Sequence, residues 1–256
     1  MNKVQLILVD GMRPQAMEAC GNPYVKELLE SSLVSMHARA VMPSCTLPCH
    51  MSLFHSVDPN RHGIVTNTYM PQVRPIRGLF EVLHAQNKKT AMFYDWEELR
   101  DLARPGNLAR AAFFSGKIDG FEQTQAKVFE ASKKAMAEED LDFTFTYFGW
   151  TDMAGHGQGW MGSEYLRAVR DAFDRIRELI ACAPADCVTI ITADHGGHDR
   201  THGTEMEEDM QIPVIVHGAG VRGILDREVS IKDLAPTITK LLDCQPDPEW
   251  EGVSLV

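Results

Sequence analysis

Three apolar segments of the chain each lead into an aspartate. They are residues 4–9 with Asp10, residues 143–150 with Asp152, and residues 188–193 with Asp194. Parallel strands release their carboxyl ends at one edge of a sheet, and ligands bind along that edge. We therefore expect the three carboxylates to meet at one place in the fold.

Histidines follow two of these aspartates at short spacing. His156 lies four residues after Asp152, and His195 and His202 follow Asp194. Three carboxylates and three imidazoles are typical of a site for two metal ions. Oxygen and nitrogen ligands without thiolate favour zinc, with manganese or iron as alternatives, and fit magnesium less well. Two divalent ions would outweigh three carboxylates, so an anionic substrate can approach despite the net charge of −11.

Thr46 supplies a hydroxyl group beside this set. It lies in the run Pro43–His50 and is expected to begin a helix. Helix starts offer unpaired N–H groups and a positive dipole end, which stabilise an alkoxide and a bound phosphate. Metal coordination would lower the pKa of the hydroxyl further. A simple N-cap threonine would be the preferred interpretation if Thr46 stood alone; the surrounding ligands favour a nucleophile.

Two of the ligand segments have plainer interpretations. Asp152 and His156 would share one face of a helix, but Gly155 and Gly157 favour a tight loop. The histidine-rich segment 194–203, taken alone, reads equally as a solvated polar loop. The coincidence of three strand-end aspartates shifts the balance toward metal binding.

Strand and helix patterns alternate along the chain. We expect strands near 3–9, 33–41, 89–94, 142–149, 187–193 and 212–217, and helices near 23–31, 46–56, 77–86, 122–138, 163–181 and 231–242. The helix at 163–181 has apolar residues every three or four positions, and Ser163 is placed to cap it. The pattern predicts an α/β fold with a mostly parallel central sheet and helices on both faces. We expect a single domain over 1–256, with 95–121 as a small, reduced cap and 57–78 as a long functional loop.

Composition excludes several classes of protein. The apolar content of 44% and charged content of 24% are ordinary for a globular protein, and the acidic net charge disfavours a nucleic-acid-polymer partner. No leader pattern precedes the first strand, and no apolar run reaches the roughly 20 residues of a membrane span. The expected location is cytoplasmic, without membrane association, and the six cysteines are expected as reduced thiols. Cys45 and Cys49 flank Thr46, but no second cysteine pair completes a zinc site.

Taken together, the chain resembles the alkaline phosphatase superfamily, and within it the type I phosphodiesterase and nucleotide pyrophosphatase branch. The resemblance covers nearly the whole length. It is carried by residues 8–11, 46–50, 58–67, 152–156, 163–165, 193–197, 201–203, 212–214 and 233–237.

The resemblance implies a distribution of ligands over two metal ions. One ion is held by Asp152, His156 and His202, and the other by Asp10, Thr46, Asp194 and His195. Asn67 would donate to a non-bridging phosphate oxygen. His198 fits a supporting role or solvent contact as well as it fits a ligand.

The run Thr46–His50 separates the branches of the superfamily. Sulfatases need cysteine or serine in C/S-x-P-x-R, whereas this chain has threonine first and histidine last. Phosphopentomutases share a threonine but carry a sizeable cap. The chain also departs from the branch: Cys45 and Cys49 replace the usual neighbours of the threonine, and Leu47 stands where an aromatic residue often packs beside the substrate.

The expected function is a two-metal hydrolase of phosphodiester or pyrophosphate bonds, with nucleotides among the small phosphorylated substrates, acting through phosphorylated Thr46. A phosphomonoesterase or phosphonate hydrolase on the same site is the nearest alternative, and an inactive metal-holding binding protein is the alternative from another class. A monoester dianion needs one more positive group, such as an arginine. Four arginines lie near the predicted site segments: Arg61, Arg74, Arg77 and Arg200.

Overall fold

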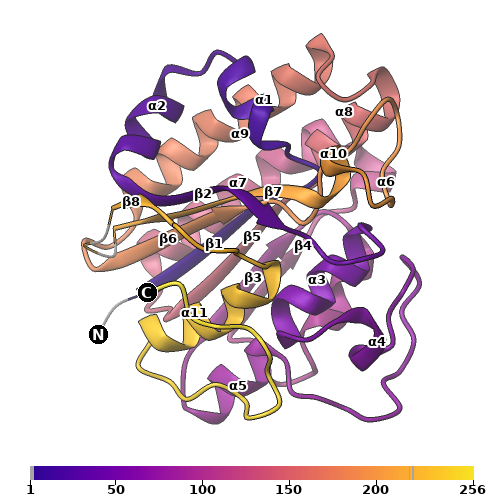
Figure 1. The fold of residues 1–256 in the computed structure, drawn as a ribbon. Helices are drawn as coiled ribbons and strands as arrows, with labels where there is room; N and C mark the ends of the chain where they lie inside the picture. Colours follow the sequence, from indigo (N-terminus) through magenta and orange to yellow (C-terminus); the bar gives the residue numbers. More distant parts are fainter. Residues whose placement is uncertain (1–2, 219, 221) are drawn as a thin grey trace.

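The fold is built around one eight-stranded sheet (Figure 1). The computed structural model describes residues 3–218, 220 and 222–256. In chain order the strands are β1 Lys3–Val9, β2 Ser32–Arg39, β3 Thr90–Tyr94, β4 Arg110–Phe113, β5 Phe143–Phe148, β6 Cys187–Thr192, β7 Gln211–His217 and β8 Gly223–Ile224. Their spatial order is β4-β3-β5-β1-β6-β7-β2-β8, and β7 runs antiparallel to both of its neighbours while the other pairs are parallel. The predicted mostly parallel α/β sheet is therefore confirmed.

The central strands are buried and mostly apolar because helices cover both of their faces. Every residue of β5 is buried, as is every residue of β1 after Lys3. In β1 the polar Gln5 is accommodated because its amide donates to the Thr189 hydroxyl of the adjacent strand at 2.7 Å. Near-continuous apolar runs of this kind are typical of a strand buried on both sides.

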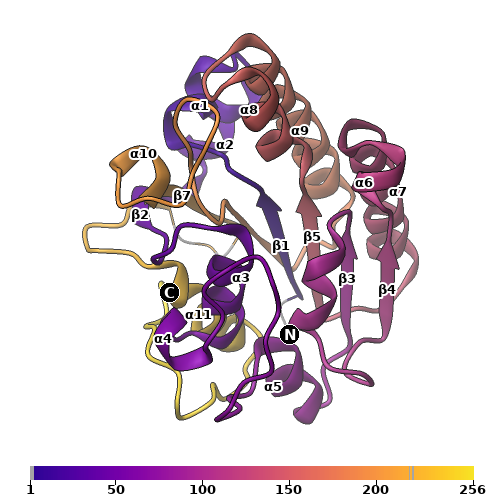
Figure 2. The same ribbon diagram turned by 90° about the vertical axis from the view of Figure 1, so that its right-hand side faces the viewer.

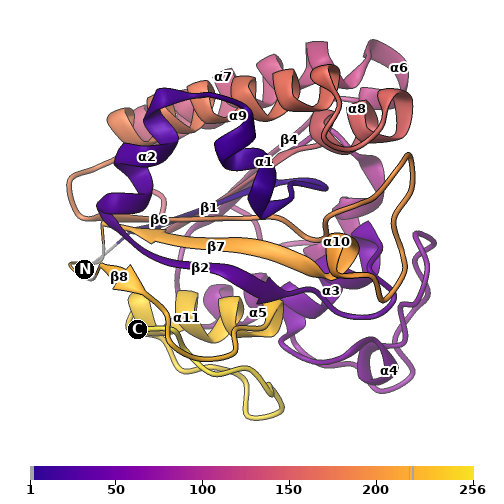
Figure 3. The same cartoon turned by 45° about the horizontal axis from the view of Figure 1, so that its top comes forward.

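Helices form a layer on each side of the sheet (Figures 2 and 3). On one side lie α1 Pro14–Ala19, α2 Pro23–Glu30, α7 Phe121–Glu138, α8 Trp150–Gln158 and α9 Ser163–Cys182. On the other lie α3 Thr46–His55, α4 Pro59–His62, α5 Leu79–Ala85 and α11 Leu234–Leu241. Two further short elements are α10 Glu207–Met210 and the 3₁₀ turn η2 Ile231–Asp233.

Helix α9 has the predicted amphipathic pattern but not the predicted cap. Val169, Phe173 and Ile176 are fully buried, which gives the helix its apolar face. Ser163 is the first helical residue, and the N-cap is Gly162 in an extended conformation. The Ser163 cap was therefore wrong, because the helix starts one residue earlier than a serine cap requires.

The tight loop predicted around Gly155 and Gly157 is also wrong: both residues lie inside helix α8. The helix ends at Gln158 and is followed by the C-cap Gly159, whose φ of +97° suits glycine. Gly155 is a glycine for packing, because a Cβ there would lie 2.7 Å from the Trp160 ring. Gly155, which the sequence pattern assigned to a turn, therefore leaves space for the Trp160 indole.

Three other segments hold more regular structure than expected. Helix α1 begins with Pro14 at its first turn, and Pro59 starts α4 inside the loop predicted over 57–78. Segment 95–121 contains the 3₁₀ turn η1 Glu97–Leu102, strand β4 and α6 Gly116–Asp119. Strand β4 is the edge strand of the sheet beside β3, so this segment is part of the sheet as well as a small cap. No helix in the described part of the chain is both long and apolar enough to cross a membrane.

Candidate metal centre and active site

The predicted ligands gather at the carboxyl edge of the sheet. Asp10 directly follows β1, and Asp194 follows β6 after one intervening residue. Asp152 lies in the first turn of α8, which begins two residues after β5, and Thr46 is the first residue of α3. Strands β5, β1 and β6 are neighbours, which is why three distant segments deliver their carboxylates to one place.

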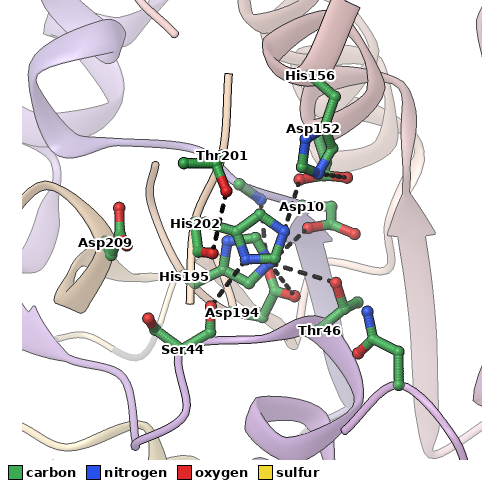
Figure 4. A network of polar contacts seen from close by, with 12 residues as sticks. Asp10, Ser44, Thr46, Asp152, His156, Asp194, His195, Thr201, His202 and Asp209 are labelled. Atoms are coloured by element: carbon green, nitrogen blue, oxygen red, sulfur yellow. Dashed lines mark hydrogen bonds and ion pairs between the residues drawn. The ribbon is translucent and has the colours of Figure 1, made fainter. Parts of the chain in front are cut away.

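One group consists of Asp10, Asp194 and His195, all buried. The His195 Nε2 atom lies 3.3 Å from Asp10 Oδ1 and 3.5 Å from Asp194 Oδ2. The Thr46 hydroxyl oxygen lies 3.3 Å from the same Nε2 atom, so the hydroxyl faces this group. Figure 4 shows the hydroxyl of Thr46 beside His195.

A second group consists of Asp152, His156 and His202. His156 Nε2 lies 3.5 Å from Asp152 Oδ2, and His202 Nε2 lies 3.7 Å from Asp152 Oδ1. The rings of His195 and His202 stack with centroids 3.8 Å apart, so the two groups adjoin (Figure 4). The helical conformation of α8 is what places Asp152 and His156 on one face.

All three histidines are oriented by the backbone. Each Nδ1 lies within hydrogen-bond distance of a carbonyl oxygen, which can only accept, so Nδ1 carries the proton and Nε2 keeps its lone pair. The acceptors for His156, His195 and His202 are the carbonyls of Arg200, Gly196 and Ser44, at 2.9, 2.7 and 2.8 Å. This arrangement fixes the tautomer and ring direction that a metal-binding imidazole needs.

The carboxylates need positive charge. Asp10 Oδ1, Asp152 Oδ1 and Asp194 Oδ2 are buried without a hydrogen-bond partner among the described residues. Burial, followed by the Asp10 charge for Asp152 and by the Asp152 charge for Asp194, raises the pKa of both carboxyl groups to about 7. Burial also lowers the pKa of His202 to about 3, so this imidazole stays neutral. Orphaned carboxylate oxygens beside neutral imidazoles fit two divalent cations.

Asn67 lies beside Thr46 in the wall of the same cavity. Its amide oxygen accepts a hydrogen bond of 3.0 Å from the Leu47 backbone N–H in the first turn of α3. The oxygen end of the amide is therefore engaged, and the NH₂ end is the one that can donate to a ligand. The donor role expected for Asn67 remains a prediction that this orientation favours.

His198 and the two cysteines lie outside both groups of ligands. His198 Nδ1 lies 2.7 Å from Asp209 Oδ1, and Asp209 also accepts from the backbone N–H of Thr204 at 2.9 Å. Asp209 therefore links His198 to Thr204, and His202 lies between these two residues in the chain. Burial raises the pKa of the thiols of Cys45 and Cys49, which keeps them protonated.

A cavity of about 250 Å³ is lined by Thr46, by Asp10 of the first group and by all three residues of the second group. Its opposite wall contains side chains that sequence reasoning did not single out: Trp96, Lys117, Phe121, Tyr147 and Met153. Three of them come from segment 95–121, whose irregular pattern had marked it as a cap. Tyr147 gave no separate signal because it lies within the apolar run of β5.

The four arginines considered from the sequence do not line this cavity. Arg61 pairs with Glu249 at 2.5 Å, and Arg77 pairs with Asp247 at 2.7 Å. Arg74 and Arg200 are likewise absent from the residues that line it. Among the described residues of the cavity wall, Lys117 is the one that carries a permanent positive charge.

Tyr147 determines how Asp10 presents its carboxylate. The phenol is 1% exposed and its hydroxyl donates to Asp10 Oδ2. Burial, followed by the Asp10 charge, raises the pKa of Tyr147, so the phenol stays a neutral donor. Because Oδ2 is engaged, Oδ1 is the oxygen left for a cation beside His195.

We expect Tyr147→Phe to weaken metal binding at the group of Asp10, Asp194 and His195 by about 10- to 100-fold, as removal of a hydrogen bond behind a metal ligand typically does. The measurement is calorimetric titration of metal-free protein with Zn²⁺. Tyr165→Phe is the matched control, since that buried phenol donates to the Gly11 carbonyl and not to a carboxylate. Equal zinc affinities in both variants would contradict the role of Tyr147.

Two family models match the chain in succession. The model described as type I phosphodiesterase / nucleotide pyrophosphatase matches residues 4–101, which include Asp10 and Thr46. The model described as metalloenzyme superfamily matches residues 115–246, more than half of the 256-residue chain. This second match contains the other five ligand positions.

Curated relatives include phosphopentomutases. The phosphopentomutase of Clostridium kluyveri is 28% identical over 157 residues, which cover 60% of this chain and 38% of that protein. The phosphopentomutase of Shewanella sp. (strain W3-18-1) is 31% identical over 134 residues, covering 52% of this chain and 31% of that protein. The chain thus spans less than half the length of these relatives.

Solved structures with the same fold come from several branches. Murine ectonucleotide pyrophosphatase / phosphodiesterase 5, in an inactive form with AMP, is 14% identical with a TM-score of 0.79, covering 97% of this chain and 96% of that one. A 2-O GAG sulfatase is 13% identical with a TM-score of 0.79, covering 99% and 73%. The phosphonate monoester hydrolase of Agrobacterium radiobacter is 14% identical with a TM-score of 0.72, covering 100% and 76%. At these identities the likeness establishes the fold, and with the family match over more than half of its length the chain belongs to the alkaline phosphatase superfamily of metalloenzymes.

Proposed function

We propose that this protein is a metal-dependent hydrolase that cleaves phosphodiester or pyrophosphate bonds of small phosphorylated substrates, with Thr46 as the nucleophile. The observation that carries the proposal is the position of the Thr46 hydroxyl. It lies at the start of a ten-residue helix, 3.3 Å from His195 Nε2, and in the wall of the cavity that Asp10, Asp152, His156 and His202 also line.

In this proposal Asp152, His156 and His202 hold one ion, and Asp10, Thr46, Asp194 and His195 hold the other. Two bound divalent ions would polarise the phosphoryl oxygens and acidify the threonine hydroxyl and a water molecule. The donor set favours zinc, with manganese and iron as alternatives.

Thr46, Asn67 and the first turn of α3 each have a separate role in the proposed reaction. The Thr46 oxygen forms a bond to phosphorus while the bond to the leaving oxygen breaks, and the threonine proton ends on the leaving group. The NH₂ group of Asn67 donates to a non-bridging oxygen, and the first turn of α3 stabilises its negative charge. Water then cleaves the phosphorylated Thr46 and restores the hydroxyl.

The cavity wall favours a diester monoanion over a monoester dianion. Lys117, the permanent cation of that wall, is held by Glu98 at 2.5 Å, and its side chain is 58% exposed. We expect the zinc-loaded protein to hydrolyse bis(4-nitrophenyl) phosphate with a kcat/KM at least about tenfold above that for 4-nitrophenyl phosphate, because the dianion lacks a dedicated arginine. Release of nitrophenolate measures both rates.

The same assay separates the alternatives. A preference for the monoester that is lost in Lys117→Ala would assign a phosphomonoesterase, and a preference for an aryl phosphonate monoester would assign a phosphonate hydrolase. No turnover of any ester by metal-loaded protein would favour a metal-holding binding protein.

A second candidate is phosphoryl transfer within a pentose phosphate, which the phosphopentomutase relatives favour. The argument against it is the cap: the family resemblance associates phosphopentomutases with a sizeable one, whereas residues 95–121 here form η1, β4 and α6. Interconversion of ribose 1-phosphate and ribose 5-phosphate, followed by phosphorus NMR, tests this candidate directly.

A further inference from the structure

A second hollow continues outward from the reaction cavity. It has a volume of about 510 Å³ and lies between the start of α7, with α6, and the exposed side of α8. Lys117, Phe121 and Met153 line both hollows and form their junction. Gly157 and Gln158 of α8 line the outer part. We call this second hollow the α6–α8 groove.

The inner cavity is too small for a large substrate. Its 250 Å³ must hold the phosphoryl group, and the metal ligands form its floor. Pockets for drug-sized ligands typically occupy about 300–1,000 Å³. Anything larger than a small ester group must therefore extend past the junction, and the α6–α8 groove is the adjoining space.

The junction combines a cation with apolar surface. An ammonium group has three donors, and the bond from Lys117 to Glu98 uses one of them. Glu98 therefore fixes the position of the ammonium and leaves donors for a ligand. Phe121 and Met153 add apolar side chains to the same junction, and Met153 is 44% exposed.

The outer part of the groove disfavours anionic groups. Glu122 and Glu164, which line it, share one partner, Arg167, at 2.7 and 2.5 Å, so their two negative charges are only partly balanced. The same guanidinium lies over the ring of Trp150, 4.5 Å from its centroid. A lining of this kind repels an anion and suits an uncharged or planar group.

We propose that the α6–α8 groove binds the far arm of the substrate: an arm with an anionic group close to phosphorus, beside Lys117, followed by a planar or uncharged portion. This inference rests on the proposed phosphoesterase function and defines the class of substrate that the site selects. Lys117 binds the anionic group of the substrate arm. The surface of α8 around Gly157 contacts only those arms that are long enough to reach it.

Gly157 makes the groove testable. A Cβ at this position would have no atom within 4 Å, so a larger side chain fits the fold and occupies the groove. Gly157→Phe is the blocking variant, and Gly157→Ala is its control, with the same backbone change and little volume. Gly157 follows His156, a predicted metal ligand, so the melting temperature and zinc content of both variants are measured as well. These values should match between the two variants.

The experiment is calorimetric titration of zinc-loaded protein with non-hydrolysable phosphonates that each have a single arm. Methylphosphonate reports the phosphoryl site alone, and 4-biphenylphosphonate adds length. In wild type the long ligand should bind at least tenfold more tightly. Gly157→Phe should remove that gain and leave methylphosphonate within twofold, and Gly157→Ala should change neither.

A second pair of ligands tests charge. Lys117→Met should weaken 4-carboxyphenylphosphonate about fivefold or more and leave phenylphosphonate within twofold. Equal binding of short and long ligands to wild type, or equal effects of Gly157→Phe on both, would overturn the groove while the phosphoryl site stands. Failure of methylphosphonate itself to bind would overturn the proposed function and the groove together.

Discussion

Thr46→Ala should lower kcat for phosphodiester hydrolysis by roughly 10³-fold or more, because it removes the atom that attacks phosphorus in the proposed reaction. The side chain is only 4% exposed but small, so its loss leaves a minor cavity. Thr46→Ser should retain measurable turnover, since a serine hydroxyl can occupy the same position. Steady-state rates with saturating Zn²⁺ measure the effect.

Two controls separate chemistry from folding. Thr239→Ala removes a buried hydroxyl that donates to the Pro236 carbonyl in α11, far from the cavity, and should leave kcat near the wild-type value. Mass spectrometry of protein quenched during turnover should find phosphate on the peptide that contains Thr46. Wild-type rates in Thr46→Ala would show instead that water attacks phosphorus directly.

Removal of divalent ions should abolish turnover and leave Asp152 and Asp194 with a contribution to stability that falls as the pH rises from 5 to 8. Burial and neighbouring charge raise the pKa of Asp152 and Asp194 to about 7. A carboxyl group with a raised pKa in the folded state favours folding below its unfolded pKa. That contribution is lost as the pH rises through the folded value. For two groups the loss is on the order of several kcal/mol.

Thermal unfolding at several pH values, with chelator or with Zn²⁺, tests this expectation. Buried histidines with lowered pKa values, such as His202, change stability with pH in the opposite direction, so the comparison is between wild type and Asp194→Asn. Without metal, the melting temperature of wild type should change less favourably from pH 5 to pH 8 than that of Asp194→Asn, since the variant lacks one carboxyl group that must lose its proton. Zn²⁺ should raise the melting temperature of wild type more at pH 8 than at pH 5, because the carboxylates gain cationic partners. Equal pH dependence in the two metal-free proteins would contradict the buried-carboxylate argument.

Local sequence patterns determined the architecture of the core. Apolar runs bounded by polar residues predicted β1, β5 and β6 to within a residue or two, because strands buried on both faces must be apolar. Once those runs are taken as parallel strands, the carboxylates at their ends have to lie at one edge. The strand ends therefore predicted that these carboxylates meet, the family resemblance implied their division into two groups, and their catalytic roles remain predictions.

Tertiary contacts decided the features that short-range patterns leave open. The pattern assigned Gly155 to a turn, but the residue lies inside α8, where the Trp160 ring fills the space that a Cβ would need. Strand β4 was missed because three of its four residues are exposed at the sheet edge and carry no periodic apolar signal.

The surroundings of the site were decided in the same way. In the sequence, Tyr147 is one more residue of the apolar run that forms β5. Its role depends on the pairing of β5 with β1, which brings Asp10 to its hydroxyl. The wall that holds Lys117 and Phe121, and the groove beyond it, form only where α6, α7 and α8 pack together. The sequence by itself determined which groups could do chemistry, because strand ends and ligand types are local properties. Only the folded chain decided what surrounds them, because a cavity wall is assembled from segments that have no local relation to one another.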